Sequence, residues 1–343
     1  MEARTVETPT LAISRDAVTR LSERLGEPEW LREQRLASWQ MFEATPTPVM
    51  TDEEWRRTDI RRLDFGSFAV PTEAPLRYEP ESSADHRDGF TQLADGYVME
   101  HHLAPGVAAK GVVFSSLSDA AATHPEIVRR YLGTLIPDGY SKFASLANAL
   151  ASGVFVYVPA GVEVALPLQA SFTLTEGGSA VFPRTLIVAE RHASVTVIDR
   201  YYSSDAETPS LSVGAVEVFT GEGAQVRYAN VQEWGRNVWN FIAQKHRVDR
   251  DAQNKNLNIA LGGKLSKANV EAELAGPGAN CEMLGLFFGD ESQFFDAHTL
   301  QDHASPNGFS DLLYKGVLRD TSRSVFSGLI RVRPGSQKTD AYQ

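Results

Sequence analysis

The hydrophobic and polar positions of this chain follow two periods, helical before about residue 150 and strand-like after it. Apolar residues recur at helical spacing within 18–25, where Gly26 can end the helix. They recur again within 36–42, after Pro28 in a suitable first-turn position. The pattern therefore predicts at least two amphipathic helices near the start of the chain.

Two further helix starts are predicted from capping chemistry. Thr51 with Glu54, and Thr123 with Glu126, have the spacing of a capping box, in which each side chain bonds a backbone amide of the other. The second pair predicts a helix from Thr123 to Leu132.

After about residue 150, short runs of β-branched and aromatic residues predominate, and most are bounded by Gly, Pro or Asp. These runs are 154–158, 186–188, 195–197 and 216–219. A turn followed by an alternating segment also recurs, starting at Ala193, Ala224, Ala252 and Ala279 with offsets of 31, 28 and 27 residues. Such a period is typical of a solenoid, in which each coil buries its inner face by stacking on its neighbours.

The repeated strands favour a parallel β-helix over a helical solenoid, with Val195, Val197, Val226 and Cys281 pointing inward. A β-sandwich with coincidental spacing is the alternative. We expect a mainly β fold with a helical N-terminal region. The predicted domains are residues 1–95, helical with an irregular polar linker over 71–95, and 96–343, the β-helix core with a helical insertion near 118–150.

Composition and charge narrow the functional classes. The 343 residues carry a net charge of −11, which disfavours nucleic acid as a partner. The one cysteine, Cys281, cannot form an internal disulfide, which fits a reducing compartment. The start of the chain does not resemble a signal peptide, and the most apolar segment, 153–168, is too short and too interrupted to span a bilayer. We therefore expect a cytoplasmic protein without membrane contact.

Three glycine-containing segments fail as nucleotide-binding sequences. Gly262-Gly-Lys264 lacks the Ser or Thr that follows the lysine of a phosphate-binding loop. The segments at 221–223 and 276–278 lack the third glycine of a dinucleotide fingerprint. The last two are predicted to be turns between coils, and we expect no ATPase activity from this chain.

Candidate metal ligands occur in one short segment that holds Asp296, His298, Asp302 and His303. In a strand the first three share a face, whereas His303 points to the other side, so a hydrogen-bonded polar ladder is the competing interpretation. The adjacent pair His101-His102 would face opposite sides for the same reason.

Cys281 alternates with apolar neighbours and is expected to be a buried structural thiol. Asp290 and Glu291, together with the acids at 296 and 302, could perform acid/base chemistry on a polysaccharide, although a solvated acidic face is the alternative. We assign no catalytic, cofactor-binding or metal residue from the sequence.

Several long segments resemble the SufB/SufD family. The segment 148–169 resembles the central signature of that family, 184–195 its next conserved segment, and 314–318, 324–332 and 339–343 its late strands. The N-terminal segments 27–30 and 52–59 are most similar to the SufD type. The cysteine that SufB places on a core strand aligns near Glu271 here, so its role is not transferred to Cys281.

The resemblance implies a right-handed parallel β-helix with a helical N-terminal region. It implies a non-enzymatic scaffold component of iron–sulfur cluster assembly that pairs with a SufB-like paralogue and a SufC-like ABC ATPase, with iron or a cluster held transiently in the complex. Family members of the SufD type continue past the segment at 339–343, so we expect a missing C-terminal segment. We expect the last coil to self-associate or to bind SufB weakly, and we expect no SufC binding. The alternatives are a carbohydrate-active β-helix enzyme and a purely structural binding protein.

Overall fold

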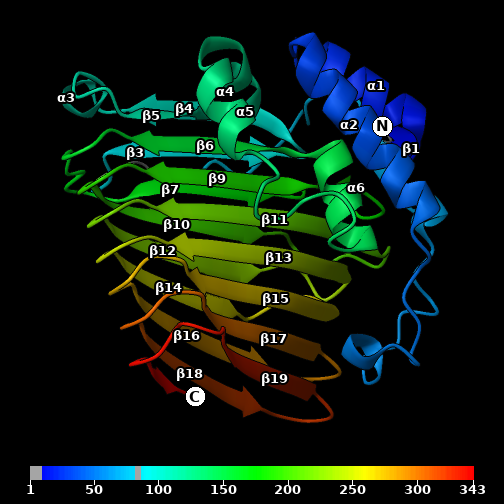
Figure 1. Cartoon of the computed structure of the whole chain (residues 1–343). Coiled ribbons are helices and arrows are strands. Elements are labelled where there is room, and N and C mark those ends of the chain that lie inside the picture. The colour runs from blue at the N-terminus through cyan, green and yellow to red at the C-terminus, as the bar shows by residue number, and fades with distance from the viewer. Residues whose placement is uncertain (1–9, 82–85) are drawn as a thin grey trace, which may run out of the picture.

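The computed structural model describes residues 10–81 and 86–343, and its main body is a parallel β-solenoid built from two sheets (Figure 1). Sheet I comprises β4 (Tyr97–Leu103), β3 (Gly89–Ala94), β7 (Leu168–Thr173), β10 (Ser194–Tyr202), β12 (Gln225–Glu233), β14 (Gln253–Ala260), β16 (Asn280–Gly289), β18 (Phe309–Leu318) and β20 (Asp340–Tyr342), in that order. Sheet II comprises β5 (Val113–Ser116), β6 (Ser152–Val158), β9 (Pro183–Ala189), β11 (Ser210–Thr220), β13 (Val238–Val248), β15 (Leu265–Leu274), β17 (Phe294–His303) and β19 (Arg323–Val332), with β8 (Ala180–Val181) beside β11.

The register of sheet I reproduces the repeat of the sequence. Ser194 pairs with Gln225, Gln225 with Gln253, and Gln253 with Asn280, all in parallel strands. The four alanines that precede these residues therefore stack above one another, and all are at most 1% exposed. The prediction of a parallel solenoid is confirmed, and the β-sandwich alternative is wrong.

The interior of the solenoid is filled by every second residue of each strand. Val195, Val197, Val226 and Cys281 are buried, as predicted. Each fully buried aliphatic side chain contributes on the order of 1.5–3 kcal/mol relative to exposure. The segments 221–223 and 276–278 lie between strands, which confirms that they are turns, and 262–264 also lies between two strands.

Helices surround the first coils, as Figure 1 shows. They are α1 (Arg15–Arg24), α2 (Glu29–Ala44), α3 (Pro105–Ala108), α4 (Leu117–Thr123), α5 (Pro125–Tyr131) and α6 (Lys142–Leu150). The predicted first two helices are confirmed: Gly26 has a positive φ just after α1, and Pro28 is the N-cap of α2. No helix in the described part of the chain is both long and apolar enough to cross a membrane.

Buried ion pairs attach this helical region to the solenoid. Arg35 of α2 pairs with Glu27 at 2.6 Å and donates to the carbonyl oxygens of Ala149 and Ala151, at the end of α6 and just beyond it. Arg184 of β9 pairs with Glu217 of β11, whose carboxylate also accepts hydrogen bonds from backbone amides of the loop before α6. The helical insertion is therefore held on sheet II by paired buried charges as well as by apolar contact.

Three local expectations were wrong. Thr51 and Glu54 form no capping box, because the segment folds as a single 3₁₀ turn, Glu53–Trp55, with Asp52 at its N-cap. Thr123 ends α4 and bonds the carbonyl oxygen of Asp119, so the following helix begins at Pro125 instead.

The third error concerns the polar linker expected over 71–95. Its last part is the buried strand β3, which joins sheet I beside β7, and residues 82–85 lie outside the described residues. The polar composition of the preceding residues hid a strand whose side chains are all buried.

Candidate functional site

The segment with candidate metal ligands forms strand β17, and the structure separates its members as the alternation predicted. Asp296 and His298 face outward from sheet II. His303 is fully buried, and its Nε2 lies 2.8 Å from Oγ of Ser310. Burial lowers the pKa of His303, so the imidazole is neutral inside the solenoid.

Asp296 is the centre of a buried polar cluster, in which Lys267 Nζ lies 2.7 Å from Oδ2 and His298 Nε2 lies 2.9 Å from Oδ1. Thr58 donates a hydrogen bond to the same carboxylate. Burial alone would raise the pKa of Asp296, but the bond with His298 and the attraction of Lys267 lower it overall. The carboxylate is therefore ionised and held by Lys267, His298 and Thr58.

The same lysine attaches a strap to the solenoid, where "the strap" means residues 45–68. Lys267 also donates to the carbonyl oxygen of Glu54 and lies 4.9 Å from the ring centroid of Trp55. Trp55 stacks on Phe143 of α6, and Phe143 stacks on Phe241 of β13 at 4.0 Å. The strap runs down one edge of the solenoid to this point (Figure 1). The cluster can therefore fix the strap, and its carboxylate is 1% exposed to solvent.

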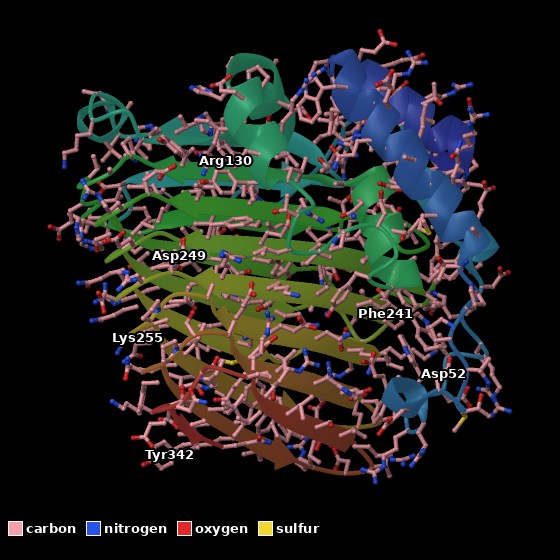
Figure 2. The ribbon with its side chains drawn as sticks, in the orientation of Figure 1. Asp52, Arg130, Phe241, Asp249, Lys255 and Tyr342 are labelled. Carbon is pink, nitrogen blue, oxygen red and sulfur yellow. The ribbon has the colours of Figure 1, made fainter. Side chains whose placement is uncertain are left out.

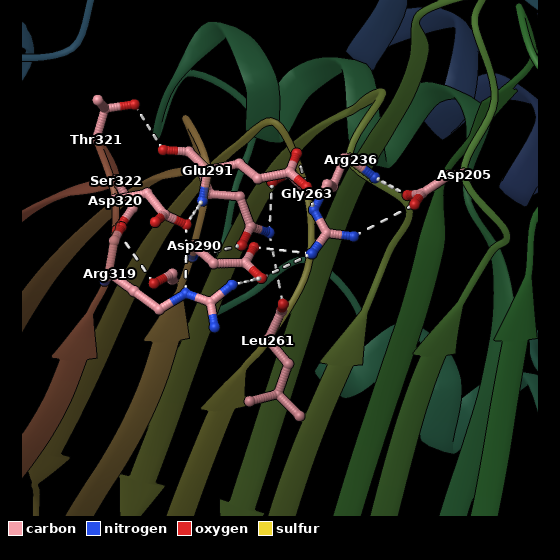
Figure 3. A network of polar contacts seen from close by, with 12 residues as sticks. Asp205, Arg236, Leu261, Gly263, Asp290, Glu291, Arg319, Asp320, Thr321 and Ser322 are labelled. Carbon is pink, nitrogen blue, oxygen red and sulfur yellow. Dashed lines mark hydrogen bonds and ion pairs between the residues drawn. The ribbon is translucent and has the colours of Figure 1, made fainter.

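The acidic residues that the sequence grouped together, Asp290, Glu291, Asp296 and Asp302, do not form one cluster, because each pairs with a basic side chain. Figure 3 shows Arg236 between Asp205 and Asp290, with Arg236 2.8 Å from the Asp290 carboxylate and 3.5 Å from Glu291. Asp302 pairs with Arg333 at 2.7 Å on the outer face of sheet II. An acid/base pair for polysaccharide cleavage would need free facing carboxylates, so this arrangement disfavours the carbohydrate-active alternative.

Cys281 lies in the core, with its Sγ 3.9 Å from Oδ1 of Asn254. Burial, with a smaller effect of Glu282, raises the pKa of Cys281 to about 12. The thiol is therefore protonated near neutral pH and cannot act as a thiolate ligand without an opening of the coil.

The remaining candidates also lie apart. His101 Nδ1 lies 2.9 Å from Thr91 Oγ1 on β3. Lys264 extends over the ring of Trp239 rather than toward a loop of free amides. Glu271 accepts a hydrogen bond from the hydroxyl of Tyr140 and pairs with Lys245. Among the described residues, no group of three His, Cys, Asp or Glu side chains is placed to share a metal ion.

One polar group inside the solenoid was missed by sequence reasoning. Asp199 of β10 is fully buried, and its Oδ2 accepts hydrogen bonds from Thr185 at 2.6 Å, Tyr228 at 2.8 Å and Tyr201 at 3.2 Å. Burial raises its pKa to about 6, although the three hydroxyl groups act in the opposite direction. The signal was present, since Asp199 continues the inward alternation of Val195 and Val197.

His246 lies near this group, with its ring 5.7 Å from that of Tyr228. Its Nε2 is 2.8 Å from the side-chain nitrogen of Asn256. Burial lowers the pKa of His246 to about 3, so the ring is neutral. The interior thus contains a neutral histidine, His246, and a weakly acidic aspartate, Asp199. The groups around Asp199 are hydroxyl groups rather than a cation.

Comparison with known proteins assigns both halves of the chain to one family. A family model described as the SufBD protein N-terminal region matches residues 19–170, and one described as the SufBD core domain of the SUF system of FeS cluster assembly matches residues 172–343. Iron–sulfur cluster assembly SufBD family proteins of Staphylococcus epidermidis and Staphylococcus saprophyticus are 27% and 28% identical to this chain. Each alignment covers 93% of this chain and 71% of the relative. The chain therefore belongs to the SufBD family of iron–sulfur cluster assembly proteins.

Proposed function

We propose that this chain is a non-enzymatic, SufD-like scaffold component that contributes to iron–sulfur cluster assembly only within a complex. The observation that carries the proposal is the state of its one cysteine, which is sealed inside a solenoid of the SufBD family with a pKa of about 12. A cluster needs thiolate or comparable ligands, so the cluster or iron would be held chiefly by other chains.

The proposed partners are a SufB-like paralogue, which would supply cluster ligands, and a SufC-like ABC ATPase, which would supply ATP hydrolysis. The segment Gly262-Gly-Lys264 supports the assignment of ATP hydrolysis to the partner. Its lysine packs on Trp239, and Leu265 stands where a phosphate-binding loop has Ser or Thr. Iron and sulfide would be cargo of the complex rather than a resident cofactor of this chain.

Co-purification tests the proposal directly. The tagged chain is expressed with a SufB-like paralogue, with a SufC-like ATPase, and with both, and the eluted complexes are reconstituted with iron and sulfide under anaerobic conditions. We expect cluster absorbance in the visible range only when the SufB-like chain is present, and ATP turnover only when the ATPase is present.

The matched variant is Cys281→Ser, which should leave both readouts of the complex unchanged if folding is intact. A strong cluster chromophore on this chain alone that is lost in Cys281→Ser would contradict the proposal. So would ATP hydrolysis by the purified chain that is lost in Lys264→Ala.

A further inference from the structure

The outer face of sheet I carries an exposed apolar patch in its later coils. "The apolar patch" means Leu261, Leu286, Phe288, Leu313 and Val317, which are 40–52% exposed. They lie on or just after β14, β16 and β18 and point away from the interior, because Cys281, Met283 and Leu312 fill the inward positions of these strands. Contiguous exposed apolar side chains of this kind mark interaction sites in soluble proteins.

The outer face of sheet II is covered over β11 and β13. α6 packs on β11, and the strap brings Trp55 close to Phe241 of β13. Figure 2 shows Lys255, which borders the apolar patch, on the opposite side of the view from Asp52 of the strap. The strap therefore does not reach the apolar patch, and among the described residues these side chains keep 40–52% of their surface open to a partner.

A row of charges borders the apolar patch, and its order is the key observation. The parallel register aligns Arg227, Lys255, Glu282 and Asp311 on successive strands β12, β14, β16 and β18. The row is therefore basic on its first two strands and acidic on its last two. Lys255 and Glu282, at its centre, pair at 2.8 Å, whereas Arg227 and Asp311 form no ion pair with another described residue.

We propose that two copies of this chain pair through the outer faces of sheet I, about a two-fold axis parallel to the strands and between β14 and β16. Such an axis reverses the order of the strands in the partner. It places Arg227 against Asp311 of the second copy and Lys255 against Glu282, twice over by symmetry. The same operation brings Leu286 opposite Ile259, Phe288 opposite Leu261 and Leu313 opposite Ala229, so apolar side chains meet at the centre of the interface. Val317 meets Glu233 at its rim.

The size of the surface sets the expected affinity. Four strands spaced about 4.8 Å apart, with outward residues about 7 Å apart along each, span roughly 20 Å by 20 Å. This is about half of the 800 Å² per partner in a typical stable interface, so the dimer should be weak, with a dissociation constant in the micromolar range. The net charge of −11 also makes two copies repel each other. Whether a dimer forms therefore depends on the attraction between the opposite charges of the row.

Sedimentation equilibrium of the purified chain over a range of micromolar concentrations tests the proposal. We expect a monomer–dimer equilibrium whose dissociation constant rises at least tenfold in Leu286→Asp. Val98→Asp on β4, which is exposed to a similar degree outside the apolar patch, should leave it unchanged. Circular dichroism confirms the fold of each variant.

Charge reversal gives the sharper test, because these surface substitutions do not threaten the fold. Arg227→Glu and Asp311→Arg should each weaken the dimer several-fold, and the double variant should restore the wild-type constant within about twofold. A strictly monomeric wild type, or a double variant no better than the singles, would overturn the proposal. Loss of the dimer in Leu329→Asp on β19, with no effect of Leu286→Asp, would place the contact on the last coil instead.

Discussion

Two buried aspartates, one inside the solenoid and one beneath the strap, respond to burial in opposite ways. Asp199 meets three hydroxyl groups and no cation, and its pKa is raised to about 6. Asp296 is equally hidden, at 1% exposure, yet Lys267 and His298 lower its pKa. Burial favours the neutral acid, and at Asp296 the hydrogen bond from His298 and the charge of Lys267 together reverse that preference.

The difference shows how this fold divides its polar groups. The interior of the solenoid tolerates polar side chains that are neutral or readily neutralised, such as His246 and Asp199. Permanent charges lie at the outer junctions, where segments from distant parts of the chain supply the counter-charge, as in the pairs Arg184–Glu217 and Lys267–Asp296. Mild acidification should therefore increase the contribution of Asp199 to stability and decrease that of His246, whereas the junction carboxylate should lose its contribution only below about pH 4.

The largest expected effect comes from breaking the junction pair. Lys267→Met should lower the free energy of unfolding by about 3–5 kcal/mol at neutral pH, because it leaves the buried carboxylate of Asp296 without its cation. Urea denaturation measures the loss, and hydrogen exchange should show faster exchange in the strap. Lys264→Met, the same change at an exposed position nearby, should cost less than about 1 kcal/mol. Equal losses in the two variants would refute the role given to the pair.

The interior aspartate should give a pH dependence of about 3 kcal/mol. Its folded pKa of about 6 lies above its ordinary value of 3.8, so the folded state binds the proton more tightly. This contribution is complete below about pH 4 and is lost as the pH rises through 6. Asp199→Asn cannot titrate, so the stability of wild type relative to this variant should fall over that interval. A difference that stays flat from pH 4 to 7 would contradict the shift.

The period of the repeat was accessible from the sequence because solenoid coils stack residue on residue. Ala193, Ala224, Ala252 and Ala279 defined the register that the strands adopt. The inward position of Cys281 followed from the same alternation. Asp199 also fitted the alternation, yet its polarity led it to be overlooked as an interior residue.

The junctions could not be predicted, because their partners are far apart in sequence. Thr58 and Asp296 are separated by 238 residues, and no local pattern links them. Capping-box spacing at Thr51 likewise failed, because the packing of Trp55 against Phe143 fixes the path of the strap more strongly than a local cap would. Tertiary contacts decided these positions over local propensity.

The junction aspartate should show the opposite pH dependence. Because the pKa of Asp296 is lowered in the folded state, its ionised form contributes stability above the unfolded pKa near 4. That contribution is lost as the pH falls through the lower folded value. The stability of wild type relative to Asp296→Asn should therefore decrease on acidification below about pH 4, as measured by urea denaturation at fixed ionic strength. An increase instead would mean that Lys267 does not compensate for burial.

The smallest expected effect is at an exposed ion pair, which sets the scale for the other predictions. Arg236 bridges Asp290, Glu291 and Asp205 in the turns at one edge of the solenoid, and its side chain is 42% exposed (Figure 3). Water solvates these charges in the folded and the unfolded chain alike, so little is gained by pairing them. Arg236→Ala should cost at most about 1 kcal/mol in the free energy of unfolding, and less at 1 M salt, where screening acts within about 3 Å. Lys267→Met should keep most of its cost at that salt concentration, because its partner is shielded from ions. If salt instead reduced the losses of Arg236→Ala and Lys267→Met in the same proportion, that result would contradict the distinction between a buried junction and an exposed network.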